Sequence, residues 1–154
     1  MRVHDARRVN AKVDRRTGLE ALERDECVAL LGRAPLGRLV VVLDGQPLAF
    51  PVNFTLDGEA IVFRSNEGTK LFAAIGCQVA FECDGTDAVY HTGWSVLATG
   101  VCEVVRNGAD RARLERLPLQ PWCEGPKATW LRIQPRTISG RRIPPHGSSR
   151  TEKD

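Results

Sequence analysis

Two Asp-Gly pairs, at residues 44–45 and 57–58, constrain the fold of this 154-residue chain more than any other feature. An Asp-Gly pair between two extended runs is a strong hairpin signal, because the favoured two-residue turn needs positive φ at both central positions. Runs with β-type residues flank the pairs at 36–43, 47–54 and 60–64. The sequence therefore predicts three antiparallel strands that follow one another as a meander.

Further extended runs occupy residues 78–84, 93–105 and 128–135, and the last is expected to continue irregularly over 137–142. A turn is predicted at residues 84–87. The longest run contains Gly100, which marks an expected bulge or bend.

Helical spacing of apolar residues predicts a helix over residues 19–32, with acidic residues on its other face. Shorter helices are expected over 70–75 and 107–116, the second capped by Asn107. No βαβ repeat, GxGxxG or P-loop motif is present. About six short strands with a few helices predict a small, mainly β protein whose antiparallel sheet closes, or nearly closes, into a barrel.

The chain has 22 basic and 19 acidic residues, a formal net charge of +3. The basic residues gather near both ends, so residues 1–17 are expected to form a flexible arm and 144–154 a disordered tail around one domain over 18–143. The middle lacks a basic, aromatic-rich face, which argues against nucleic-acid binding. No apolar run reaches membrane-spanning length and no signal-peptide h-region is visible, which predicts a cytoplasmic protein.

Acid–base and metal chemistry find little support in the sequence. The five cysteines include no CxxC pair, so buried free thiols are expected, with Cys102 partly exposed between polar neighbours. His91 is the only histidine outside the predicted tails, and a structural or exposed position is the expectation for it. No GxSxG motif and no metal-ligand spacing occur. This scarcity of acid–base, nucleophilic and metal-binding groups is compatible with an enzyme whose chemistry is carried by a bound cofactor.

Residues 63–70 read as a strand end, a turn and a helix start. The segment combines a guanidinium, an ammonium, hydroxyls and a glycine that lets backbone N–H groups approach a ligand. Free N–H groups at a helix start favour an anion, so the segment predicts a phosphate site, the alternative being a solvated polar turn. The candidate ligand groups are Arg64, Ser65, Thr69 and Lys70.

For three other groups of residues, the sequence is consistent with either a binding role or a structural role. Pro51, Val52 and Asn53 interrupt a strand, so freed backbone donors could meet the heteroatoms of a planar ring, or form a plain strand edge. Trp94 and Ser95 could be core and surface residues or could line a pocket. Arg132 stands in an otherwise apolar strand and needs a partner if buried, either a ligand phosphate or a carboxylate on a neighbouring chain.

Several short motifs in fixed order resemble the pyridoxamine 5′-phosphate oxidase-like, flavin-binding split-barrel superfamily over about residues 19–143. They are Gly37-Arg38-Leu39, Pro51-Val52-Asn53, Ile61-Val62-Phe63-Arg64-Ser65, Gly68-Thr69-Lys70-Leu71, Phe81-Glu82, and Gly93-Trp94-Ser95-Val96-Leu97 with Thr99-Gly100.

The resemblance implies a six-stranded, Greek-key split β-barrel flanked by helices. It also implies a homodimer that holds flavin mononucleotide (FMN) in a groove between subunits. Arg64, Ser65, Thr69 and Lys70 would hold the phosphate. Val52 and Asn53 would face the isoalloxazine ring, Trp94 and Ser95 would approach from the partner subunit, and Arg132 is a weaker assignment.

Residues 139–144 lack the arginine-and-histidine substrate signature of the oxidase itself, which argues against pyridoxamine phosphate as the substrate. The expected function is therefore FMN-dependent oxidation or reduction of another small molecule. The alternatives are a reductase that uses the deazaflavin F420 and a non-catalytic protein that binds a flavin or haem, because related proteins bind F420, haem or biliverdin in the same groove.

Overall fold

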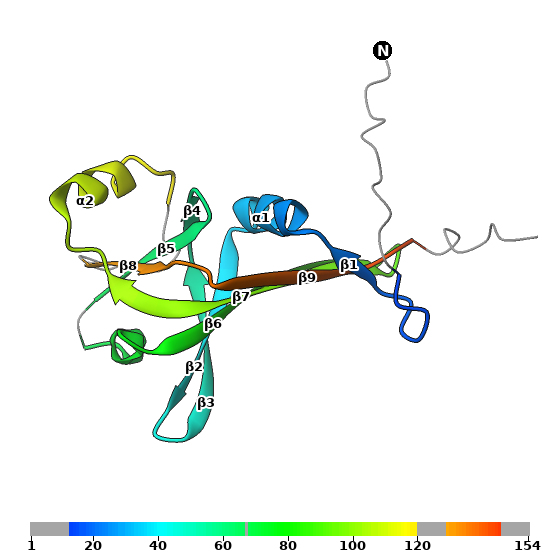
Figure 1. The fold of residues 1–154 in the computed structure, drawn as a ribbon, viewed down its shortest axis with the longest axis horizontal. Coiled ribbons are helices and arrows are strands. Elements are labelled where there is room, and N and C mark those ends of the chain that lie inside the picture. Colours follow the sequence, from blue (N-terminus) through cyan, green and yellow to red (C-terminus); the bar gives the residue numbers. More distant parts are fainter. Residues whose placement is uncertain (1–12, 67, 120–128, 146–154) are drawn as a thin grey trace, which may run out of the picture.

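The computed structural model describes residues 13–66, 68–119 and 129–145. This part of the chain is mainly β structure, with α2 at one end of the molecule and α1 over its middle (Figure 1). Its strands are β1 (Glu20–Leu22), β2 (Leu36–Leu43), β3 (Gln46–Asn53), β4 (Thr55–Asp57), β5 (Ala60–Ser65), β6 (Gln78–Asp87), β7 (Thr92–Val104), β8 (Thr129–Ile133) and β9 (Thr137–Ile143). Its helices are α1 (Arg24–Arg33), the 3₁₀ helix η1 (Lys70–Ala74) and α2 (Gly108–Leu114).

All strand pairs are antiparallel, and hydrogen-bonded neighbours follow the order β3-β2-β6-β7-β8-β5-β4. Strand β9 pairs with β7 and also with β1. This architecture confirms the mainly β, split-barrel prediction, but nine strands replace the expected six. The count rises because β1 and β4 are only three residues long and because β9, predicted as irregular, is a regular strand along β7.

Strand β7 pairs with three other strands, β6, β8 and β9. Its first part pairs with both β6 and β9, whereas its last residues pair with β8. The change of partner occurs at Gly100, where an added Cβ would lie 2.4 Å from the carbonyl oxygen of Gln134. At Gly100, where the sequence predicted a bulge or bend, the chain between β8 and β9 therefore passes close to the backbone of β7.

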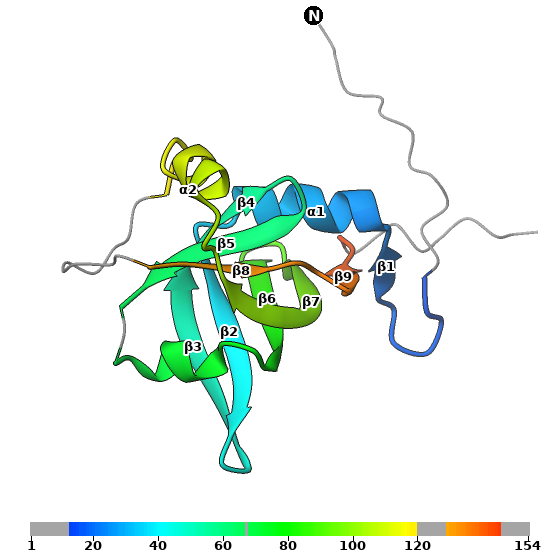
Figure 2. The same ribbon diagram turned by 60° about the vertical axis from the view of Figure 1, so that its left-hand side comes forward.

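Both predicted Asp-Gly hairpins are present, but the meander is wrong in the pairing of its third strand, because the hairpin at Asp57-Gly58 joins β5 to the short β4. The first Asp-Gly pair does join β2 to β3, with Asp44 and Gly45 both at positive φ (49° and 75°), and this hairpin projects from the body (Figure 2). However, β5 pairs with β4 and β8, not with β3. The chain leaves the β2–β3 pair after Asn53, because the buried Phe54 turns into the core against Phe81.

Two element boundaries also differ from the prediction. Helix α1 begins at Arg24, because Glu23 and Glu26 form a reciprocal capping box and residues 20–22 pair with β9 instead. Strand β6 continues through the predicted turn at 84–87 to Asp87, and the turn falls at residues 88–91. Cross-strand pairing with β7 as far as Thr92 outweighs the local turn signal.

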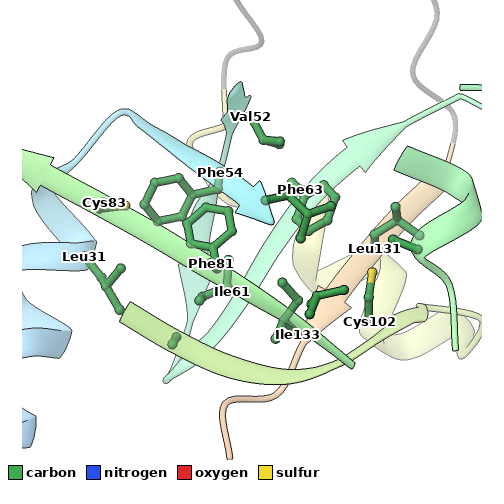
Figure 3. Close-up of a cluster of buried hydrophobic side chains, with 14 of the residues drawn as sticks. Leu31, Val52, Phe54, Ile61, Phe63, Phe81, Cys83, Cys102, Leu131 and Ile133 are labelled. Carbon is green, nitrogen blue, oxygen red and sulfur yellow. The ribbon is translucent and has the colours of Figure 1, made fainter. Parts of the chain in front are cut away.

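The core lies inside the curved sheet and is closed by α1. It contains aromatic rings and branched side chains from most strands, including Phe54, Phe63, Phe81, Ile61 and Ile133 (Figure 3). A smaller cluster lies on the outer face of β5 and β8, where α2 covers it; its members are Val62, Val105, Leu114 and Trp130. Asn107 caps α2 as predicted, accepting hydrogen bonds from the amides of Ala109 and Asp110.

Some predictions lie outside the described residues: most of the arm (1–12), much of the proline-rich loop (120–128) and most of the tail (146–154). At the inner end of the arm, Val13 forms a bridge with Glu20. Within the described ranges, none of the helices has the length and apolar character needed to cross a lipid bilayer.

Candidate functional site

The predicted strand-to-helix turn is present. Strand β5 ends at Ser65, and η1 begins at Lys70. Between them the amide of Thr69 donates to the carbonyl of Asn66 (3.4 Å), and Gly68 has a φ of 85°. Positive φ at the third position of such a turn favours glycine, which explains the residue at 68.

The two hydroxyls of the turn lie together. Ser65 is almost completely buried, and its Oγ is 2.9 Å from Thr69 Oγ1. Thr69 Oγ1 also donates to the carbonyl oxygen of Asn66 (2.9 Å), and Ser65 Oγ lies 3.4 Å from the same oxygen. Both hydroxyl protons are thus used inside the turn, and either hydroxyl must rotate before it can donate to an anion.

Arg64 lies on the opposite face of β5 from Ser65, because successive strand residues alternate between faces. Its guanidinium carbon is 5.2 Å from the centroid of the Trp130 ring, and the two residues are directly opposite in the β5–β8 register. The Nε atom of Arg64 is buried and has no hydrogen-bond partner among the described residues. A guanidinium stacked in this way keeps its in-plane N–H groups free for an anion.

Lys70 is exposed at the first position of η1. Neither Lys70 nor Arg64 forms an ion pair with any residue in the described part of the chain. The turn therefore has a cation on either side, neither of them paired with a residue that the structure describes, together with a preformed hydroxyl pair. No contact within the described ranges joins Lys70 to Arg64.

Pro51, Val52 and Asn53 form the end of β3, opposite Arg38, Gly37 and Leu36 of β2. Pro51 is exposed and Val52 is buried. The side chain of Asn53 donates to the carbonyl of Pro35 at 3.1 Å. Figure 3 shows Val52 and Phe63 in one cluster, so this end of β3 lies near β5 without pairing with it.

Trp94 and Ser95 lie near the start of β7. Ser95 is opposite Asp84 of β6, and β6 pairs with β2, whose Leu36 is opposite Asn53. The residue opposite Arg64, Trp130, lies at the other end of β7, where its carbonyl accepts from the amide of Val105. Ser95 is exposed, whereas Trp94 lines an open pocket of about 450 Å³ with Arg142 and Asp87. Figure 1 shows the same separation, with α2 and β8 at one end of the molecule and β1 at the other.

Arg132 has its partners within its own chain. Its guanidinium lies 3.0 Å from Glu103 and 3.5 Å from Asp110. The expected partner on a ligand or a neighbouring chain is therefore not required to balance this charge. The reason is register: Arg132 and Glu103 are directly opposite on β8 and β7, which the sequence did not reveal.

Two of the thiols, Cys83 and Cys102, are unsuited to nucleophilic chemistry. Burial raises the pKa of Cys83 and of Cys102 to about 12, and Cys102 is fully buried, not partly exposed as predicted. His91 is exposed on the turn between β6 and β7. Among the residues that the structure describes, no group of three His, Cys, Asp or Glu side chains is arranged to hold a metal ion.

Trp130 is the site residue that sequence reasoning missed. It was assigned only to a strand, yet it forms the platform beneath Arg64 and is held by a 2.8 Å hydrogen bond from its Nε1 to Glu115. Its alternation with Arg132 along β8 was visible in the sequence. The pairing with Arg64 depends on the β5–β8 register.

Comparison with known proteins gives one consistent result. The sequence profile of the pyridoxamine 5′-phosphate oxidase family matches residues 23–142. An uncharacterised protein of Mycobacterium tuberculosis is 34% identical over 128 residues, which cover 79% of this chain and 84% of that protein.

Solved structures agree with the sequence match. An FAD-binding protein from Mycobacterium smegmatis superposes with a TM-score of 0.72 at 41% identity, covering 79% of this chain and 98% of that one. A conserved protein from Corynebacterium diphtheriae superposes with a TM-score of 0.68 at 31% identity, covering 80% and 96%.

Proposed function

Since this chain belongs to the pyridoxamine 5′-phosphate oxidase family, we propose that it binds the FMN half of a flavin cofactor and acts as a flavin-dependent oxidoreductase on a small molecule. The sequence prediction named FMN, and the M. smegmatis relative binds FAD. FMN is the part that both cofactors share. The substrate is not expected to be pyridoxamine phosphate, because residues 139–144 lack the signature that would hold it.

The observation that carries the proposal is the environment of Arg64. A buried guanidinium nitrogen without an acceptor is costly unless a ligand supplies one. Here that nitrogen sits above Trp130 at the end of β5, next to a turn whose other side presents the unpaired Lys70. The donor set fits a phosphate, with Arg64 and Lys70 as the principal ligands and Ser65 and Thr69 as donors after rotation.

The cofactor is held between two copies of the chain. Within one chain, Trp94 and Ser95 lie near the start of β7, whereas β8, which pairs with the strand of Arg64, contacts the end of β7. A homodimer in which the start of β7 of one copy faces the turn of the other brings these residues to one groove. The end of β3, with Val52 and Asn53, then lies beside the ring and Trp94 closes it from the partner.

The bound flavin supplies two-electron transfer, and the protein supplies binding and shape. The Trp94 indole and the apolar end of β3 exclude water from the ring. Arg64 and Lys70 balance the phosphate charge. The described residues offer no histidine near this end of the barrel, and burial raises the pKa of Cys102 to about 12, so the substrate or water is expected to exchange the proton.

This lack of acid–base groups favours a second candidate, a non-catalytic flavin carrier or sensor that uses the same site. Haem is a poorer fit for it. His91, the sole histidine within residues 13–66, 68–119 and 129–145, lies exposed on a hairpin tip. A deazaflavin remains the alternative cofactor for an enzyme, because its phosphate would make the same contacts.

The test is titration of the purified protein with FMN, FAD and F420, for the wild type and for Lys70→Ala. A lost charge-assisted hydrogen bond is worth about 1.5–3 kcal/mol, so the variant should bind flavin roughly 10- to 100-fold more weakly. Arg136→Ala, which removes an exposed cation outside the turn, is the matched control and should bind normally.

Unchanged flavin affinity in Lys70→Ala would contradict the assignment of this turn as the phosphate site. Binding of F420 without binding of FMN or FAD would mean that the cofactor is the deazaflavin. Flavin that binds but is never reduced by a nicotinamide donor would favour the carrier. Size-exclusion chromatography with light scattering tests the homodimer, since a monomer that binds flavin fully would contradict the shared groove.

A further inference from the structure

Three residues form a chain of contacts that leads from α2 to the proposed phosphate site. The carboxylate of Glu115 accepts a 2.8 Å hydrogen bond from the indole Nε1 of Trp130. The Trp130 ring in turn lies 5.2 Å from the guanidinium carbon of Arg64, its opposite residue in the β5–β8 register. Within the described ranges no hydrogen bond or ion pair joins Glu115 to Arg64 directly, so the indole ring is what connects them.

The position of Glu115 is fixed by contacts other than the one with Trp130. Glu115 is the C-cap residue of α2. The helix is attached to the sheet by the fully buried Leu114 and by the ion pair between Arg113 and Asp57 (2.7 Å). The Trp130 ring is only 2% exposed, so its N–H needs a partner inside the protein. An acceptor at the end of an anchored helix therefore sets the orientation of the indole.

The orientation of the Trp130 ring affects where the Arg64 guanidinium can lie. A cation is attracted to the face of an aromatic ring, so a rotated indole would offer Arg64 the ring edge instead. The carboxylate also polarises the indole N–H bond, which strengthens the attraction of the ring for the cation. The buried Nε of Arg64 has no partner among the described residues, and its N–H can meet a phosphate only while the guanidinium keeps this setting.

We propose that Glu115 is a positioning residue for the anion site: it holds Trp130 so that Arg64 presents its in-plane N–H groups to the flavin phosphate. The inference rests on the proposed function, because Arg64 is a phosphate ligand only if the flavin binds at this turn. A hydrogen bond that merely satisfies the indole N–H would contribute to stability alone. A positioning residue, in contrast, affects flavin affinity and loses this effect when Arg64 is replaced.

The experiment is a double-mutant cycle on the full chain, with FMN affinity measured by fluorescence titration. Glu115→Leu should weaken FMN binding roughly three- to tenfold, the size of a cation–π contact, and should have no effect in an Arg64→Ala background. Trp130→Phe keeps a ring but removes the N–H, so Glu115→Leu should have no effect in that background either. Glu115→Gln keeps an oxygen acceptor and should bind FMN within about twofold of the wild type.

Glu103→Leu is the matched control. Glu103 is another exposed glutamate that holds a side chain of β8, since it lies 3.0 Å from the Arg132 guanidinium. Within the described part of the chain it forms no hydrogen bond with Trp130, so this variant should bind FMN normally. Near-UV circular dichroism of the ligand-free protein, which reports the setting of tryptophan rings, should change in Glu115→Leu and not in Glu103→Leu.

The contrary results can be told apart from a failure of the proposed function. An unchanged affinity in Glu115→Leu, or an equal loss with and without Arg64, would overturn the positioning role and leave the proposed function intact. A Glu115→Gln variant as weak as Glu115→Leu would overturn it as well. Lys70→Ala is measured in the same titration, and unchanged FMN affinity in that variant would overturn the proposed function together with this inference.

Discussion

Arg64 and Trp130 face each other across the β5–β8 pair, with the guanidinium carbon 5.2 Å from the indole centroid. The contact fixes a cation near the end of a strand, and the Nε atom of Arg64 is buried with no hydrogen-bond partner among the described residues. An exposed cation–π contact contributes only about 0.5–1 kcal/mol to stability, and we propose that the main role of Arg64 is to bind an anion.

Arg64→Ala should therefore separate binding from stability. We expect flavin affinity to fall at least tenfold, whereas the free energy of unfolding of the ligand-free protein should change by no more than about 1 kcal/mol. Arg64→Lys should restore affinity only partly, since lysine lacks the planar fork. Urea unfolding and flavin titration measure the two effects. A loss of stability above about 3 kcal/mol with normal binding would make Arg64 a structural residue.

Gly85→Ala should displace Trp94. A Cβ at position 85 would lie 2.5 Å from the indole Nε1, so the ring has to move. Overpacking of this kind costs about 1–3 kcal/mol. The expected results are lower stability in urea and weaker flavin binding.

The double variant Gly85→Ala/Trp94→Leu tests the cause of that effect. If the clash is responsible, the added methyl group should cost little stability once the ring is absent. Additive losses would show that Gly85 acts through another neighbour.

The Asp57–Arg113 pair should make stability depend on pH. A hydrogen bond from Arg113 (2.7 Å) lowers the pKa of Asp57, so the folded state favours the carboxylate. A depressed pKa contributes stability above the ordinary value of 3.8, and this stability is lost as the pH falls through the folded pKa. Arg113→Ala should thus be less stable than wild type by about 0.5–1 kcal/mol at pH 7, as for other partly exposed pairs.

The difference in the free energy of unfolding between wild type and Arg113→Ala, measured by urea titration, should decrease below about pH 4, where Asp57 is protonated. Arg116→Ala, at an exposed position nearby, should show no such pH dependence. A gap that stays constant down to strong acid would mean that packing of the Arg113 side chain is responsible.

Thiol labelling should distinguish Cys77 from the buried cysteines. With a pKa of about 12, Cys83 and Cys102 carry about one part in ten thousand of thiolate at pH 8, and they are fully buried. In a Cys123→Ser background, an aromatic disulfide reagent should label the half-exposed Cys77 in the native protein. Labelling of Cys27, Cys83 and Cys102 should require urea. Fast native labelling of Cys102 would mean that the barrel opens readily.

Much of the local structure followed from the sequence. The Asp44-Gly45 hairpin, the Asn107 cap and the turn at Gly68 each depend on the conformational preference of a few adjacent residues, so the pattern was sufficient. The same holds for the cluster of cations and hydroxyls at 64–70, the proposed phosphate site, whose members are close in sequence. The match to the family over residues 23–142 agrees with the motif order read from the sequence.

What the sequence determined by itself was the kind of protein: a small antiparallel barrel with cations and hydroxyls gathered where a strand turns into a helix. Only the tertiary structure decided which strands are neighbours. It placed β5 beside β8, set Trp130 under Arg64 and paired Arg132 with Glu103. The physical reason is that register and strand order come from burying side chains of distant segments in one core. Local turn and periodicity preferences contain no information about which of those segments will meet.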